Sequence, residues 1–179
     1  MEKTLVFLTV DTEVWPWTPN WRDSRLSKDM ERDLYGITSE GEFGLRFQIK
    51  VLNAHALKAV FFVESLFANA VGLEPLRETV ELIQEQGQDV QVHVHPEWLA
   101  YASRSTHHTK VTENMKDFSQ NEQVSIISQA IRNLRSCGAQ HLCAFRAGNY
   151  GANWKTLSAL TQNNILYDTS YNPCYLAGC

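Results

Sequence analysis

Long apolar runs and an excess of basic residues are both missing from this sequence of 179 residues. The apolar run at 5–10 is too short to span a bilayer or to form the core of a signal peptide, so we expect a cytoplasmic chain with no membrane span. The formal net charge of -4 argues against nucleic acid as a partner, because phosphate binding normally needs a basic face. A neutral or small polar substrate fits this charge better.

Cysteine pairs and glycine-rich loops are missing as well. The four cysteines form no CxxC pair and lack the spacing of small secreted domains, so neither a disulfide framework nor a structural zinc site is expected. No GxGxxG or GxxxxGK[ST] follows the first predicted strand, which removes the strongest argument for a nucleotide-binding sheet. With 44% hydrophobic and 20% charged residues, the chain is expected to form one soluble globular domain over 1–179.

Short β-branched or aromatic runs alternate with longer segments of helical spacing, a pattern typical of βα units around a parallel sheet. The predicted order is strand 4–10, helix 44–57, strand 58–63, helix 72–86, strand 89–95, helix 122–136, strand 142–145, helix 152–162 and strand 165–167. Gly87 and Gly138 are expected to end two of these helices, and 14–43 is expected to be irregular. Such a series, about five units, fits an open doubly wound sheet or part of a barrel. The missing nucleotide loop favours an α/β fold of the partial barrel type.

Two acids leave the first predicted strand. Asp11 and Glu13 are two residues apart, so in an extended chain both carboxylates point to the same side. Like charges repel each other there unless a cation lies between them or one of them is paired with a base. A turn or helix N-cap acid stays open as the alternative, because Asp is common at the starts of loops.

Two histidines end the third predicted strand. Apolar and polar residues alternate over 90–95, so His93 and His95 share one face, and Pro96 keeps His95 extended. Paired imidazoles together with a carboxylate suit Zn²⁺ or a related divalent ion that keeps a position open for water. A lone histidine is more often a structural residue, but two in register at a strand end predict a metal site. Glu97 stays open as a competing ligand or as a hydrogen-bond acceptor behind a ligand.

Arg146 follows the fourth predicted strand, in the segment FRAGNYG at 145–151. Arginine stays protonated in proteins, so Arg146 cannot be the base, but its fork can hold a carboxylate such as Asp11 ionised and oriented. The two glycines of this segment allow a tight turn that aims backbone N–H groups at an oxyanion. A structural ion pair at the end of the sheet is the alternative.

Three tryptophans follow the first strand. Trp15, Trp17 and Trp21 offer flat faces to a sugar ring or, alternatively, cover the mouth of the sheet. His107 and His108 lie in a polar segment, predicted as loop or short surface helix, and are expected to be solvated.

The motifs resemble the first three motifs of the polysaccharide deacetylase, or NodB-homology, family. They are TVDTE at 9–13, HVHPEW at 93–98 and FRAGNYG at 145–151, and their order and spacing also agree. YDTS at 167–170 is loosely similar to a later family segment. The resemblance covers nearly the whole chain and implies a distorted (β/α) barrel of the glycoside hydrolase/deacetylase type, with a divalent metal ion, Zn²⁺ first, as cofactor.

The resemblance also implies a role for each motif residue. These roles are general base for Asp11, metal ligand for Glu13 and His93, completion of the metal site for His95 or Glu97, bracing of the base for Arg146, and a backbone N–H toward the oxyanion for Tyr150.

The sequence departs from the usual family pattern in three places. Thr12 separates acids that are usually adjacent, and the histidines are one residue apart where the family spaces them four apart, so a divergent Asp-x-Glu and His-x-His-Pro subgroup is the closer match. The family's late leucine–histidine motif, whose histidine is the general acid, has no counterpart, because no histidine follows His141. We therefore expect the N-terminal part of a longer barrel, from a truncated chain or gene fragment.

The expected activity is metal-dependent hydrolysis that removes N-acetyl groups from an amino sugar or polysaccharide precursor, with an N-acetylated sugar as the partner. An Asp base would activate metal-bound water. Two alternatives stay open: a hydrolase of non-sugar amides or cyclic ureides with the same site, and an inactive domain that binds metal or sugar. The oligomeric state is left open.

Overall fold

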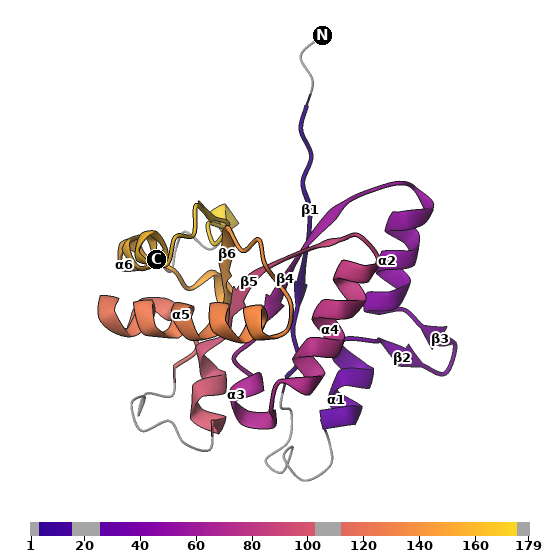
Figure 1. Cartoon of the computed structure of the whole chain (residues 1–179), viewed down its shortest axis with the longest axis horizontal. Helices are drawn as coiled ribbons and strands as arrows, with labels where there is room; N and C mark the ends of the chain where they lie inside the picture. Colours follow the sequence, from indigo (N-terminus) through magenta and orange to yellow (C-terminus); the bar gives the residue numbers. More distant parts are fainter. Residues whose placement is uncertain (1–3, 16–25, 103–111, 175–179) are drawn as a thin grey trace.

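A parallel sheet forms the centre of the computed structural model, which describes residues 4–15, 26–102 and 112–174 (Figure 1). The elements are β1 (Leu8–Thr12), α1 (Leu26–Asp33), β2 (Ile37–Thr38), β3 (Gly41–Glu42), α2 (Leu45–Ala54), β4 (Ala59–Glu64), α3 (Ala68–Val71), α4 (Glu74–Glu85), β5 (Asp89–Val94), α5 (Gln120–Ser136), β6 (Ala144–Ala147), α6 (Trp154–Gln162) and β7 (Tyr167–Asp168), with short 3₁₀ helices at Pro96–Tyr101, Met115–Asp117 and Gly148–Tyr150. Within these ranges no helix is long and apolar enough to cross a membrane.

The strands of the main sheet follow one another in chain order. Its order is β1-β4-β5-β6-β7, and every neighbouring pair is parallel, while β2 and β3 form a separate hairpin. A doubly wound sheet reverses its order at a switch point, whereas a (β/α) barrel does not. The predicted α/β fold of the partial barrel type is therefore confirmed. In the part of the chain that the structure describes, β1 and β7 are edges and the barrel is not closed.

Alternation along the strands gives the sheet two different faces. One face packs against α4 and α5 in the main core through apolar side chains: Val10, Phe61, Val63, Val90, Val92, Val94, Phe145 and Ala147. The residues between them point to the opposite face. In register these are Asp11 beside Phe62 and Gln91, and Glu64 beside His93 and Arg146. The chemistry-bearing residues thus share the face that the helices leave uncovered.

The residues at the ends of α4 and α5 explain where these two helices begin or stop. Helices α4 and α5 are each followed by a glycine with positive φ, Gly87 at 71° and Gly138 at 103°, as predicted. In both cases the next residue donates its N–H to a carbonyl in the last helical turn. Helix α5 begins with a capping box in which Ser119 and Glu122 exchange hydrogen bonds. These local signals set where the helices stop and the strands that follow can begin.

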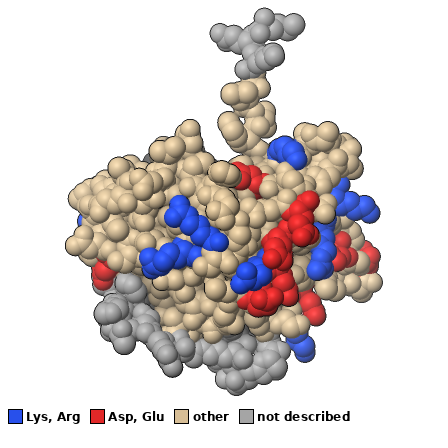
Figure 2. Space-filling model, viewed as in Figure 1, with Lys and Arg blue, Asp and Glu red and all other residues tan. Residues whose placement is uncertain are grey.

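The prediction for the first strand was wrong in its bounds. The sequence predicts 4–10, but β1 spans Leu8–Thr12, and residues 4–7 project from the body of the protein (Figures 1 and 2). Leu5 is 79% exposed. The physical reason is the pairing partner. Strand β4 begins at Ala59, opposite Leu8, so residues 4–7 have no part of β4 beside them to pair with. Strand β6 lies two residues later than predicted, and β7 begins two residues later and ends one residue later.

The stretch 14–43 is not irregular throughout, which corrects a second prediction. It contains α1 and the β2–β3 hairpin. Met30 and Leu34 pack on Val14 in a small cluster separate from the main core. Only Leu26 and Met30 are apolar within the eight residues of α1, and so short a pattern does not stand out in the sequence.

The outer surface seen in Figure 2 carries charges of both signs, with acidic and basic side chains next to each other over α2 and α4. Arg46 contacts Glu42 at 3.3 Å, and Arg77 contacts Glu74 at 3.5 Å. This face therefore has mixed charges, as is usual for solvent-facing helices.

Candidate active site

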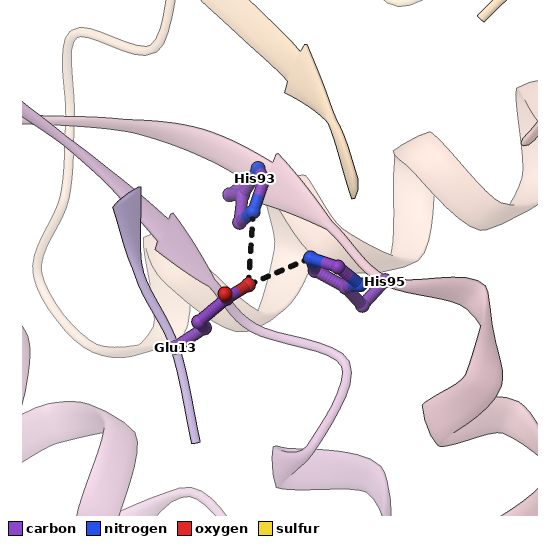
Figure 3. A group of neighbouring side chains, drawn as sticks. All are labelled: Glu13, His93 and His95. Carbon is purple, nitrogen blue, oxygen red and sulfur yellow. Dashed lines mark hydrogen bonds and ion pairs between the residues drawn. The ribbon is translucent and has the colours of Figure 1, made fainter. Parts of the chain in front are cut away.

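Two strands of the sheet, β1 and β5, bring the three predicted metal ligands together (Figure 3). Glu13 comes directly after β1, His93 lies near the end of β5, and His95 follows that strand. Because the strands are parallel, their carboxyl ends meet at one edge, where the sites of (β/α) barrels form. The cluster lies at this edge.

The geometry of this cluster is compact. The carboxylate oxygen Oε2 of Glu13 lies 2.6 Å from Nε2 of His95 and 3.2 Å from Nε2 of His93. One ligand atom from each residue lies within 4.8 Å of the others, and no other group of this kind occurs in the described residues. Both imidazoles are buried, at 2% and 4% exposure, while Glu13 is partly open to solvent.

The second nitrogen of each ring shows which tautomer the protein favours. Nδ1 of His93 lies 2.9 Å from the backbone oxygen of Arg146, and Nδ1 of His95 lies 3.3 Å from Oε1 of Glu97. Both partners can only accept, so each Nδ1 donates a proton. In the neutral rings both Nε2 atoms then present lone pairs to the Glu13 carboxylate. Three lone-pair donors that converge are unfavourable without a positive charge between them, and a divalent cation suits this donor set.

The pKa shifts show how the metal-free protein relieves this conflict. Burial opposes a charge on Glu13, but hydrogen bonds and charges from His93 and His95 outweigh it and hold the pKa of Glu13 well below its usual range. Burial also opposes a charge on His95, yet Glu13 and Glu97 raise the pKa of His95 to about 10. A proton on His95 thus supplies the positive charge that a metal ion would otherwise bring.

Asp11 is held by an arginine from another strand. Nη1 of Arg146 donates to Oδ1 of Asp11 at 2.6 Å, Nη2 donates to Thr9 at 3.0 Å, and Nε donates to Thr169 at 3.1 Å. The guanidinium also lies over the ring of Phe62, at 4.3 Å from its centroid. Each of the three nitrogens of Arg146 donates one hydrogen bond, so the guanidinium is held in place beside the Asp11 carboxylate. Thr9 and Thr169 lie in the segments TVDTE and YDTS, but the sequence did not indicate that they contact Arg146.

The FRAGNYG segment passes close to His95. A Cβ atom on Gly148 would lie only 2.5 Å from Nδ1 of His95, so glycine is required for this approach. The following residues Asn149 and Tyr150 both have positive φ, at 54° and 52°. Such backbone costs on the order of 1–3 kcal/mol per residue and is concentrated at functional sites. The predicted oxyanion residue Tyr150 therefore lies in a strained turn beside the cluster.

The remaining predicted residues are divided between the described and undescribed parts of the chain. The ring of Trp15 meets His95 edge-on, with centroids 4.6 Å apart, and its backbone is held by Arg32 and Asp33 of α1. Trp17, Trp21, His107 and His108 lie outside the described residues.

Sequence reasoning missed Glu64, a carboxyl with 0% exposure that is in register with His93. Burial raises the pKa of Glu64 to about 8, against hydrogen bonds from the N–H groups of Phe67 and Leu66.

Comparison with known proteins gives a likeness in structure only. No protein-family model and no curated protein matches the chain. A protein described as a polysaccharide deacetylase from Mycobacterium smegmatis is similar with a TM-score of 0.61 and 18% identity, over 90% of this chain and 49% of that one. The Streptococcus pyogenes deacetylase PplD in complex with acetate gives a TM-score of 0.54 and 15% identity, over 92% of this chain and 54% of that one.

A CE4 family pseudoenzyme from Bacillus anthracis also matches, with a TM-score of 0.51 and 18% identity, over 69% of this chain and 36% of that one. The chain thus spans between 36% and 54% of the length of these three structures. At such identities the likeness shows the fold alone. The fold of this chain is that of the CE4 polysaccharide deacetylases.

Proposed function

We propose that this chain is a metal-dependent hydrolase that removes N-acetyl groups from an amino sugar or a polysaccharide precursor. The observation that carries the proposal is the convergence of Glu13, His93 and His95, whose ligand atoms lie within 4.8 Å of one another at the carboxyl edge of a sheet with a deacetylase fold. Two imidazole nitrogens, one carboxylate oxygen and an open side form the ligand set of a catalytic Zn²⁺ site.

A divalent cation held by these three residues would act as a Lewis acid on a carbonyl oxygen and lower the pKa of water. The chain's own residues supply the rest. Asp11 accepts the proton of the attacking water at its carboxylate, and Arg146 directs this carboxylate through the hydrogen bond from its Nη1. Tyr150, in the strained turn at 148–150, would donate its backbone N–H to the oxyanion that forms on the acetamido carbonyl. The C–N bond then breaks, the proton held by Asp11 passes to the leaving nitrogen, and acetate and a free amine are the products.

Metal content measured by elemental analysis, beside an acetate-release assay, tests this proposal. We expect near-stoichiometric zinc in the parent protein, its loss in Glu13→Ala and His93→Ala, and unchanged zinc in His55→Ala, whose histidine is exposed and outside the cluster. Asp11→Asn should keep the metal and lose turnover. A folded parent that binds no zinc, cobalt or manganese would contradict the metal site, and full activity of Asp11→Asn would contradict the base.

The substrate panel should contain N-acetylated sugars and their oligomers beside small amides and cyclic ureides. Acetate release from the sugars alone supports the deacetylase. Turnover of the amides or ureides alone would instead support a hydrolase of non-sugar amides or cyclic ureides. The same metal site serves both, so the panel separates them without further variants.

A second candidate function is a domain that binds metal or sugar without turnover. One observation favours it: a similar fold occurs in a CE4 family pseudoenzyme. Retained metal with no product across the whole panel would support this function over the deacetylase.

A further inference from the structure

Glu97 lies on the far side of His95 from the metal group. Its Oε1 is 3.3 Å from Nδ1 of His95, while Nε2 of the same ring is 2.6 Å from Glu13. The two nitrogens of an imidazole point in different directions, so a carboxylate at Nδ1 cannot reach an ion bound at Nε2 of the same ring. Glu97 is accordingly not among the residues whose ligand atoms converge.

The carboxylate of Glu97 is also tied to the FRAGNYG segment. Nδ2 of Asn149 donates to Oε1 of Glu97 at 3.5 Å and to the backbone oxygen of Glu113 at 3.2 Å. Asn149 is the first of the two residues with positive φ in the strained turn. The same carboxylate oxygen therefore contacts a predicted metal ligand and the turn that would meet the oxyanion.

Packing leaves the His95 ring little freedom. The ring of Trp15 meets it edge-on at 4.6 Å between centroids, and Gly148 approaches it so closely that no Cβ fits between them. The ring of His93 lies 4.8 Å away, at an interplanar angle of 79°. These contacts limit translation of the ring, but apolar and backbone contacts do not decide which nitrogen carries the proton. When Nε2 faces a bound cation, an acceptor at Nδ1 keeps the proton of the neutral ring on that nitrogen.

We infer that Glu97 is a positioning residue, which fixes the tautomer and angle of His95 so that Nε2 presents its lone pair to a bound cation and which links this ligand to Asn149. The inference rests on the proposed metal site. It also settles the alternative left open by the sequence, since Glu97 acts behind the ligand His95 instead of replacing it. Removal of such an outer partner typically lowers metal affinity by about 10–100-fold.

The test compares Glu97→Ala and Glu97→Gln with Glu85→Gln, an exposed glutamate on α4 that serves as the matched control. Zinc affinity is measured by competition with a chelator dye, and the His95 ring by nitrogen NMR on the metal-free protein. We expect an affinity loss of about 10–100-fold for Glu97→Ala. A smaller loss is expected for Glu97→Gln, whose amide oxygen can still accept from Nδ1, and no loss for Glu85→Gln. The Nδ1 proton signal of His95 should be lost or exchange-broadened in Glu97→Ala only.

Several results would overturn the inference. Unchanged zinc affinity and an unchanged His95 spectrum in a folded Glu97→Ala would show that Glu97 does not hold the ring. An affinity loss as large as that of His95→Ala would make Glu97 a ligand. If the parent itself binds no zinc, the proposed function fails, while the NMR comparison still decides whether Glu97 orients His95.

Discussion

Replacement of Gly148 by alanine should displace the ring of His95 and so weaken metal binding at the proposed site. The added Cβ would lie 2.5 Å from Nδ1 and 2.6 Å from Nε2 of His95. Carbon atoms in ordinary contact are about 3.5–4.0 Å from their neighbours, so the imidazole or the turn must move by about 1 Å. Overpacking of this kind costs about 1–3 kcal/mol of folding stability. A displacement of about 1 Å at a catalytic site can lower turnover by about 100-fold.

Gly151→Ala is the matched control for this prediction. Its Cβ would lie 2.7 Å from Cβ and 2.9 Å from Cγ of Asn114, so the overlap is similar but is not with a ring of the cluster. We expect both variants to lose comparable stability in chemical denaturation, and only Gly148→Ala to lose zinc affinity. Equal zinc affinity in the two folded variants would refute the reasoning, because it would show that the position of His95 does not control the site.

Three further predictions follow from the same geometry. Arg146→Lys keeps a charge beside Asp11 but loses the forked guanidinium. We expect kcat to fall about 10–100-fold, in line with the loss of a charged hydrogen bond of about 1.5–3 kcal/mol. An unchanged kcat would contradict the role of Arg146. Because the pKa of His95 is raised to about 10, zinc binding near pH 8 should release one proton, which calorimetry in buffers of different ionisation enthalpy detects; no release would contradict the protonated ring. The buried Glu64 carboxyl, with its pKa raised from 4.5 to about 8, binds its proton more tightly in the folded than in the unfolded chain. Stability of the metal-free protein should therefore fall as pH rises from about 4.5 through about 8, and Glu64→Gln should lack this part of the slope in urea titrations.

Alternation and helix ends were the features of the fold that the sequence predicted well. The valines between Asp89 and His95 placed both histidines on one face, and Gly87 and Gly138 marked two helix ends. The start of β1 could not be predicted, since it depends on where β4 begins, 51 residues further along the chain than Leu8. Strand bounds of this kind are set by pairing partners and not by local composition.

The residues of the candidate site also divide into those with a local signal in the sequence and those whose role depends on distant segments. Residue types and spacing indicated Glu13, His93 and His95, because a strand end and an i, i+2 pair are local features. The role of Glu97 stayed open in the sequence, since only the folded chain shows which ring nitrogen it faces. The approach of Gly148 to His95 is equally non-local, as it joins segments 53 residues apart.

The bonds made by Arg146 have a consequence for the order in which the protein matures. Glu13 meets its histidine partner His93 80 residues later in the chain, whereas Asp11 meets Arg146 only after 135 residues. During synthesis from the N-terminus, the ion-binding group can therefore assemble once β5 has emerged, well before the base is braced. On the proposed function, a nascent chain would hold its three metal ligands before Arg146 meets Asp11, and a metal ion bound at that stage would favour the correct pairing of β1, β4 and β5.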